Sequence, residues 1–239
     1  MTMNKSALNE ILEKYKKAFP RWWDDPQNPK KREKFKWIAV KWFQDNWNID
    51  APDFCEMLKL ALRETGELIE SRGVRGREMI EFFARHAPEE VRAMFAGLYD
   101  ERLPVFERMT SFKDHAQALL EKYGTESKTV HGQTENAMSV YLWLRYPDKY
   151  YIYRFELMKK FAETIYPDYS FVSGRYRQNI ENCMKLFRHI NNRYIKADQE
   201  LVGMLKERIT DECYPDPELV TLTFDVGYFV YRGCKLDNN

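Results

Sequence analysis

Aromatic and basic side chains that lie close together along the chain are the strongest candidates for chemistry in this sequence. Aromatic faces could stack on exposed nucleic-acid bases while neighbouring lysines and arginines contact phosphates, because every base offers a π-face. The base-stacking candidates are Trp143, Tyr146, Tyr150 and Tyr153, together with Trp22 and Trp23. Packing in a hydrophobic core is the alternative for each of these rings taken singly.

Positive charge is concentrated in two segments, although the whole chain has 38 Lys and Arg against 37 Asp and Glu. Residues 1–47 hold eleven basic against six acidic side chains, and residues 172–208 hold eight against four. In the second segment, helical spacing puts Arg177, Lys185, Arg188 and Lys196 on one side of a helix, away from its apolar stripe. Such faces suit a DNA phosphate backbone, and a merely solvated surface is the alternative. The phosphate-binding candidates are Lys30, Lys31, Arg32, Lys34, Arg175, Arg177 and Arg188.

Motifs of the common enzyme and metal-binding classes are absent from the sequence. It has no GxxxxGK[ST] phosphate loop, no HExxH or HxE…CxxC metal-ligand spacing and no GxSxG nucleophile elbow. Its cysteines, Cys55, Cys183, Cys213 and Cys234, are widely separated, which favours buried free thiols over a disulfide or a zinc site. We therefore predict no catalytic residue, no metal site and no cofactor, and we expect that this chain is not an enzyme.

The segments that carry these residues have mostly helical periodicity. We predict a mainly α, multi-helix globular fold with at most one short strand pair or small sheet, for which 150–153 is the best short strand or extended turn. The first helix is expected to be capped by Ser6 and to end at Phe19-Pro20. The segment that follows Asp216 fits both a helix and an alternating strand, and we favour the helix. The polar residues 124–134 predict a connecting loop between two helical subdomains, 1–123 and 135–239.

The sequence also bears on the cellular compartment. No stretch approaches the roughly 20 apolar residues that span a bilayer, and the start of the chain, MTMNKSALNEIL, lacks the apolar core of a signal peptide. We therefore expect a cytoplasmic protein with no membrane partner.

Two segments resemble a particular protein family. They are YLWLRYPDKYYIY at 141–153 and FPRWWDDPQNPKKREKFKWIAVKWFQDNW at 19–47. Both are similar to the N-terminal region of McrB-like proteins, the AAA+ GTPase subunits of type IV, modification-dependent restriction systems, and the resemblance extends over essentially the whole chain. It implies a DNA-recognition module of anti-phage defence that reads modified cytosine or adenine.

The resemblance also implies partners. An AAA+ GTPase domain would follow this region on its C-terminal side, and an McrC-like subunit would supply the nuclease. Because the chain ends before any nucleotide-binding motif, we expect an excised N-terminal domain, with a stand-alone relative as the alternative. Two other functions stay open. One is a protein-interaction or sensor module of a defence system, and the other is an enzyme acting on nucleic acid, whose acidic residues meet only on folding.

Overall fold

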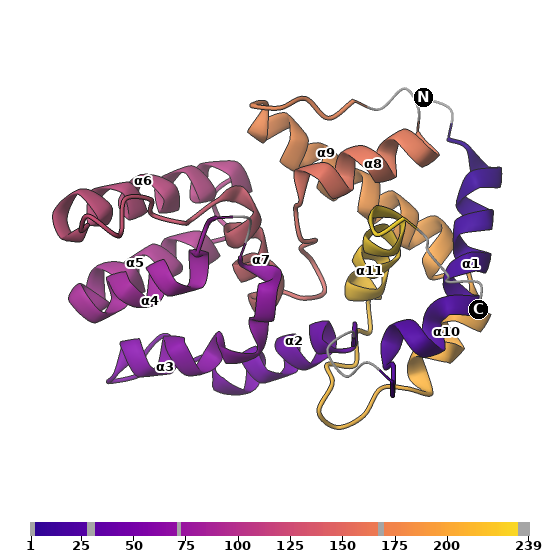
Figure 1. Ribbon diagram of the computed structural model, residues 1–239, viewed down its shortest axis with the longest axis horizontal. Coiled ribbons are helices and arrows are strands. Elements are labelled where there is room, and N and C mark those ends of the chain that lie inside the picture. The colour runs from indigo at the N-terminus through magenta and orange to yellow at the C-terminus, as the bar shows by residue number, and fades with distance from the viewer. Residues whose placement is uncertain (1–2, 28–31, 71–72, 167–169, 234–239) are drawn as a thin grey trace. The chain divides into compact units, whose positions relative to one another are not determined.

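The computed structural model describes residues 3–27, 32–70, 73–166 and 170–233, and it confirms the mainly α fold class (Figure 1). No strand occurs in these ranges, and residues 150–153 form neither a helix nor a strand. The chain divides into two compact units. The first consists of Met1–Trp37 with Asp148–Asn239, and the second is Ile38–Pro147.

The first unit is built around its last helix. Its elements are α1 (Lys5–Trp23), the first turn of α2 (Phe35–Asn46), α8 (Phe155–Ile165), α9 (Tyr176–Ile190), the π-helical turn η2 (Asn191–Ile195), α10 (Gln199–Lys206) and α11 (Val220–Tyr231). Helix α11 packs against α1, α8, α9 and η2. It is buried without interruption from Val220 to Gly227, as expected of a helix that is apolar on all sides. This helix confirms the helical prediction for the segment after Asp216.

Helix α1 differs from its prediction at both ends. Asn4, and not Ser6, is the N-cap, because the Asn4 side chain accepts a hydrogen bond from the Ala7 amide at 3.0 Å. The helix also continues through Pro20 to Trp23, although proline inside a helix removes one backbone hydrogen bond. The Trp23 ring lies 5.7 Å from Phe19 and 4.7 Å from Trp37. Burial of these aromatic rings offsets the cost of the proline.

The second unit is a cluster of helices around α5. Its elements are the rest of α2, α3 (Phe54–Ala61), the 3-10 helix η1 (Arg63–Leu68), α4 (Gly76–His86), α5 (Pro88–Tyr99), α6 (Val105–Tyr123) and α7 (Glu135–Arg145). Helix α5 packs against α3, α4, α6 and α7. Phe95 of α5 makes ring contacts with Trp47, Phe54, Phe112 and Tyr141, which lie at the centre of this core.

The segment 124–134 lies within the second unit, between α6 and α7, so the compact units divide elsewhere than at this predicted loop. Its end is attached to α4, because the Gln133 side chain donates to the Gly76 carbonyl at 2.8 Å. Gly132 has a φ of +75°, and a Cβ there would meet the Arg75 carbonyl oxygen at 3.1 Å. The segment 124–134 is therefore part of the second unit although it is polar, because its backbone and the Gln133 side chain contact α4.

Within the described residues, every helix is too short or too polar to cross a lipid bilayer.

Candidate nucleic-acid interface

A row of exposed polar side chains follows the second half of α9 and the turn η2. They line an open hollow of about 290 Å³ and are Lys185, Arg188, His189, Asn192 and Arg193. Their spacing of three to four residues places them on one helical face. The opposite face of α9, which includes Ile180, Cys183 and Phe187, is buried. The amphipathic pattern of α9 therefore directs these cations to solvent, and we call this surface the α9–η2 face.

The π-helical turn extends the α9–η2 face beyond the end of α9. The Lys196 amide donates to the Asn191 carbonyl at 3.0 Å, which is the five-residue bond of a π-helix. The buried Asn191 side chain donates to the Glu218 and Leu219 carbonyls and to the Thr223 hydroxyl, each at 2.9 Å. Anchored by these bonds, the wider turn leaves the next two residues, Asn192 and Arg193, exposed beside Arg188.

The cations of the α9–η2 face have no acidic partner in the part of the chain that the structure describes. There, the side chains of Lys185, Arg188 and Arg193 form no ion pair and no hydrogen bond. Uncompensated positive charge on a helix face creates a local potential that attracts polyanions. The face can therefore hold phosphate groups without first breaking internal salt bridges.

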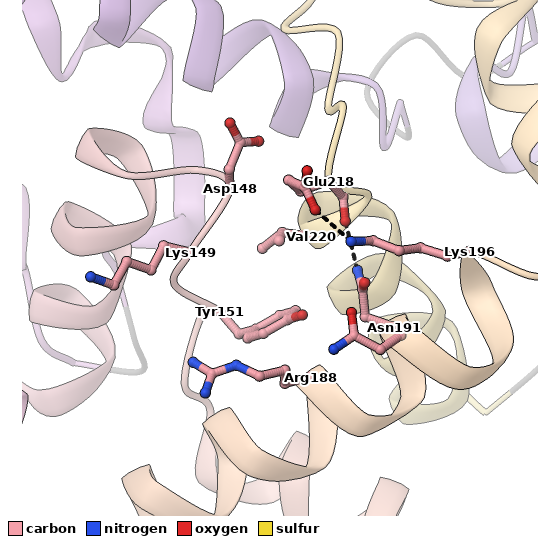
Figure 2. Close-up of a pocket in the computed structure, with 9 residues that line it drawn as sticks. Asp148, Lys149, Tyr151, Arg188, Asn191, Lys196, Glu218 and Val220 are labelled. Carbon is pink, nitrogen blue, oxygen red and sulfur yellow. Dashed lines mark hydrogen bonds and ion pairs between the residues drawn. The ribbon is translucent and has the colours of Figure 1, made fainter.

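A second hollow adjoins the α9–η2 face. It has a volume of about 200 Å³ and is lined by Asp148, Lys149, Tyr151, Arg188, Asn191, Asn192, Lys196, Glu218 and Val220. Figure 2 shows Arg188 alongside the Tyr151 ring, and Lys196 pointing toward Glu218, with which it forms an ion pair. Arg188 and Asn192 line both hollows, so the two are neighbours on the surface. We call this second hollow the Tyr151 pocket.

The predicted phosphate-binding residues have different surroundings. Lys30 and Lys31 lie outside the described residues. Arg32 and Lys34 share Asp24, at 3.2 Å and 2.9 Å, and Lys34 also lies 3.5 Å from Glu212, so both cations have acidic partners. The remaining three lie at the start and in the last turn of α9 and are exposed: Arg175, Arg177 and Arg188. Of the seven, only Arg188 lines either hollow described here.

Most of the predicted base-stacking rings are buried. Four of them are at most 7% exposed and present no open face to a base: Trp23, Trp143, Tyr150 and Tyr153. The half-buried Trp22 donates its indole N–H to Asp225 at 2.8 Å, and its ring packs on Tyr228 and Phe229. The half-buried Tyr146 donates its hydroxyl to the Tyr99 carbonyl at 2.9 Å. Trp143 and Tyr146 belong to the second unit and the other rings to the first, so neither unit holds all six.

The sequence analysis did not single out several residues of the two hollows: His189, Asn192 and Arg193 of the face, and Tyr151 of the pocket. The spacing of Lys185, His189 and Arg193 at four-residue intervals is visible in the sequence and could have identified the face. The π-helical turn that keeps Asn192 and Arg193 exposed has no such signal, since it depends on contacts of Asn191 with residues 218–223.

A buried charge cluster occupies the core of the first unit. Asp225, which is fully buried, accepts hydrogen bonds from Tyr15 at 2.5 Å, from Trp22 at 2.8 Å and from Lys36 at 2.5 Å. Lys36 also pairs with Glu33. Burial raises the pKa of the Glu33 carboxyl, against the opposing charge of Lys36. Burial lowers the pKa of Lys36, but the two carboxylates outweigh it and the net shift is upward. The cluster holds the start of α2 on α11.

The cysteines have the surroundings of structural thiols. Cys183 and Cys213 are buried and free, Cys55 is half-buried and free, and Cys234 lies outside the described residues. Burial raises the pKa of the Cys183 thiol, which leaves it protonated and unreactive.

Neither the comparisons with known proteins nor the potential metal ligands identify a class of site. No protein-family model, no curated protein and no solved structure matches this chain, so the McrB-like resemblance stays a prediction. In the described ranges, no group of three or more His, Cys, Asp or Glu side chains is arranged to hold a metal ion.

Proposed function

We propose that this chain is the DNA-recognition module of an McrB-like restriction protein and that it holds the DNA backbone through the α9–η2 face. The observation that carries the proposal is a set of exposed cations on one face, Lys185, Arg188 and Arg193, whose side chains have no acidic partner within the described ranges. The McrB-like context rests on the sequence resemblance, and the exposed cations support the α9–η2 face as the contact.

The size and chemistry of the face suit a phosphate backbone. From Lys185 to Arg193 the chain advances by about 12 Å, a length over which duplex DNA carries about seven charges. Arginine donates to two phosphate oxygens at once, and lysine, histidine and asparagine add further donors. Contacts of this kind fix the position of a protein on DNA without reading its sequence.

Reading of modified cytosine or adenine belongs to the same proposal and rests on the resemblance. The buried rings at Trp143, Tyr150 and Tyr153 do not supply a reading surface as they stand. The AAA+ GTPase domain and the McrC-like nuclease would carry the catalytic steps, with this module delivering them to DNA.

The test is a binding titration with matched variants. Fluorescence anisotropy of labelled duplexes, unmodified or carrying 5-methylcytosine, 5-hydroxymethylcytosine or N6-methyladenine, is measured at several salt concentrations. The triple variant Lys185→Gln, Arg188→Gln, Arg193→Gln should bind all duplexes about 10- to 100-fold more weakly. Its log–log salt slope should fall by about 2.7, since each phosphate contact contributes about 0.9.

The control removes the same charge elsewhere. Lys14, Lys59 and Lys122 are exposed and already paired with Glu10, Glu56 and Glu90. The triple variant Lys14→Gln, Lys59→Gln, Lys122→Gln should keep the wild-type affinity and salt slope. Equal losses in the two triple variants would show that net charge alone drives binding, and absence of binding by the wild type would reject the proposed function.

A further inference from the structure

The Tyr151 pocket has a size that fits one small group. Its volume of about 200 Å³ lies below the roughly 300–1,000 Å³ of pockets that enclose a whole drug-sized ligand. It is nevertheless much larger than the space of a single water molecule. A ligand would therefore insert one end into this pocket while the rest of it stays on the neighbouring surface.

Tyr151 provides a donor that the protein itself leaves unused. The residue is 3% exposed, and its hydroxyl has no hydrogen-bond partner among the described residues. The ring is held in place by stacking on Phe187, with centroids 5.1 Å apart. Figure 2 shows the hydroxyl pointing across the pocket toward Asn191 and Lys196. Burial raises the pKa of this phenol, so it is protonated and donates at neutral pH.

The charges that line the pocket favour an anion. Lys196 and Glu218 neutralise each other in an ion pair. Asp148 keeps its negative charge, because the Tyr214 hydroxyl that it accepts at 2.8 Å is neutral, but Figure 2 shows its carboxylate and the Lys149 ammonium pointing away from Tyr151. The charge beside Tyr151 that has no acidic partner among the described residues is the Arg188 guanidinium.

We infer that the Tyr151 pocket binds a terminal phosphate, the phosphomonoester at the end of a nucleic-acid strand or on a free nucleotide. A monoester presents three acceptor oxygens. Arg188, the Tyr151 hydroxyl and the Asn192 amide are donors for them. An internal phosphodiester is flanked by a sugar on each side and stays on the open face. For a strand end the inference rests on the proposed function, because Arg188 and Asn192 connect the pocket to the α9–η2 face.

The experiment compares strand ends. Anisotropy titrations compare three forms of one labelled oligonucleotide, which carry a 5′-phosphate, a 3′-phosphate or hydroxyl groups at both ends. Isothermal titration calorimetry compares the binding of deoxythymidine 5′-monophosphate with the binding of thymidine. The wild type should prefer one phosphorylated end about tenfold, and the monophosphate over the nucleoside. Tyr151→Phe leaves every charge in place and should remove most of this preference, so the result separates a donor in the pocket from general attraction of an added charge.

Two matched variants complete the test. Tyr194→Phe removes a hydroxyl nearby on η2 that does not line the pocket, and it should keep the wild-type preference. Lys185 lines only the open face. Lys185→Gln should therefore weaken binding of all strands equally and leave the preference for a phosphorylated end unchanged. Thermal melts of the variants confirm that each is folded.

The outcomes separate the two proposals. Equal binding of phosphorylated and hydroxyl ends by the wild type overturns the pocket inference and leaves the proposed function in place. If the wild type binds the monophosphate, Tyr151→Phe abolishes that binding and no strand binds, the pocket inference is supported and the proposed function is rejected. If neither the monophosphate nor any strand binds, both proposals are rejected.

Discussion

The start of α2 and the α9–η2 face both carry clustered lysines and arginines, but their surroundings are opposite. Lys36 in α2 is 1% exposed and is enclosed by the carboxylates of Asp225 and Glu33. Lys185 and Arg188 are exposed and have no acidic partner among the described residues. A cluster of positive charge can thus be part of a core or part of a binding surface. Which of the two it becomes depends on acidic residues distant in sequence, since Lys36 and Asp225 are 189 positions apart.

Disrupting the buried cluster should have the strongest consequence. Lys36→Met keeps the length of the side chain but leaves Asp225 and Glu33 without their cation. Removing one partner of a buried ion pair destabilises by about 3–5 kcal/mol, because the remaining charge stays desolvated. Urea unfolding should show this loss for Lys36→Met and less than about 0.5 kcal/mol for the exposed Lys185→Met. Equal losses would remove the distinction between the two regions.

A second prediction uses Asp216, which ties the first turn of α2 to α11. This fully buried carboxyl accepts from the Thr221 and Leu222 amides and from the Trp37 indole, and burial raises its pKa to about 6 from 3.8. The Asp216 carboxyl therefore binds a proton more tightly in the folded state than in the unfolded state, and this proton binding stabilises the fold at low pH. The stabilisation is lost as pH rises from about 4 to about 6. Its size is on the order of 3 kcal/mol.

Asp216→Asn tests this pH dependence because the amide does not titrate. The difference in unfolding free energy between wild type and Asp216→Asn, measured by urea titration from about pH 3.5 to about pH 7, should change in favour of the variant as pH rises. A difference that is independent of pH would show that Asp216 has the same pKa in both states.

A third prediction compares one cation from each region. Arg188→Gln should weaken DNA binding about tenfold at low salt, because its guanidinium lines both hollows and has no internal partner among the described residues. Lys34→Gln should leave DNA affinity unchanged, because its ammonium is held by Asp24 at 2.9 Å and Glu212 at 3.5 Å. Anisotropy titrations of the two variants measure the two DNA affinities. An equal loss of affinity in both would show that ion pairing within the protein does not decide which cations bind DNA.

The weakest effect should come from converting a paired cation into an unpaired one. Glu218→Gln removes the exposed partner of Lys196 and should raise DNA affinity about twofold, while stability changes by less than about 1 kcal/mol. Anisotropy at low salt measures the affinity, and a thermal melt measures the stability. Unchanged or weaker DNA binding would exclude Lys196 from the interface.

The local features of this protein could be predicted from the sequence because they depend on neighbouring residues. Apolar residues at helical spacing, Ile180, Cys183 and Phe187, predict an amphipathic helix, and the structure confirms it. Of the cations predicted for its outer side, Arg177, Lys185 and Arg188 are exposed, whereas Lys196 lies beyond η2 and pairs with Glu218. The helix after Asp216 was likewise predicted. Pro20 predicts a helix end, but in the structure the helix continues, because ring packing of Trp23 against Trp37 outweighs the local preference.

The pattern of residues along the chain was enough to establish the mainly α fold, the amphipathic α9 and the absence of the common catalytic motifs. Folding settled the rest: which aromatic rings are buried, which lysines are neutralised, and where the Tyr151 hydroxyl lies unused beside Arg188. The two groups of properties differ in the range of the interactions behind them. Helix periodicity is set by residues three and four positions apart, whereas burial and ion pairing are set by side chains that folding brings together from distant parts of the chain.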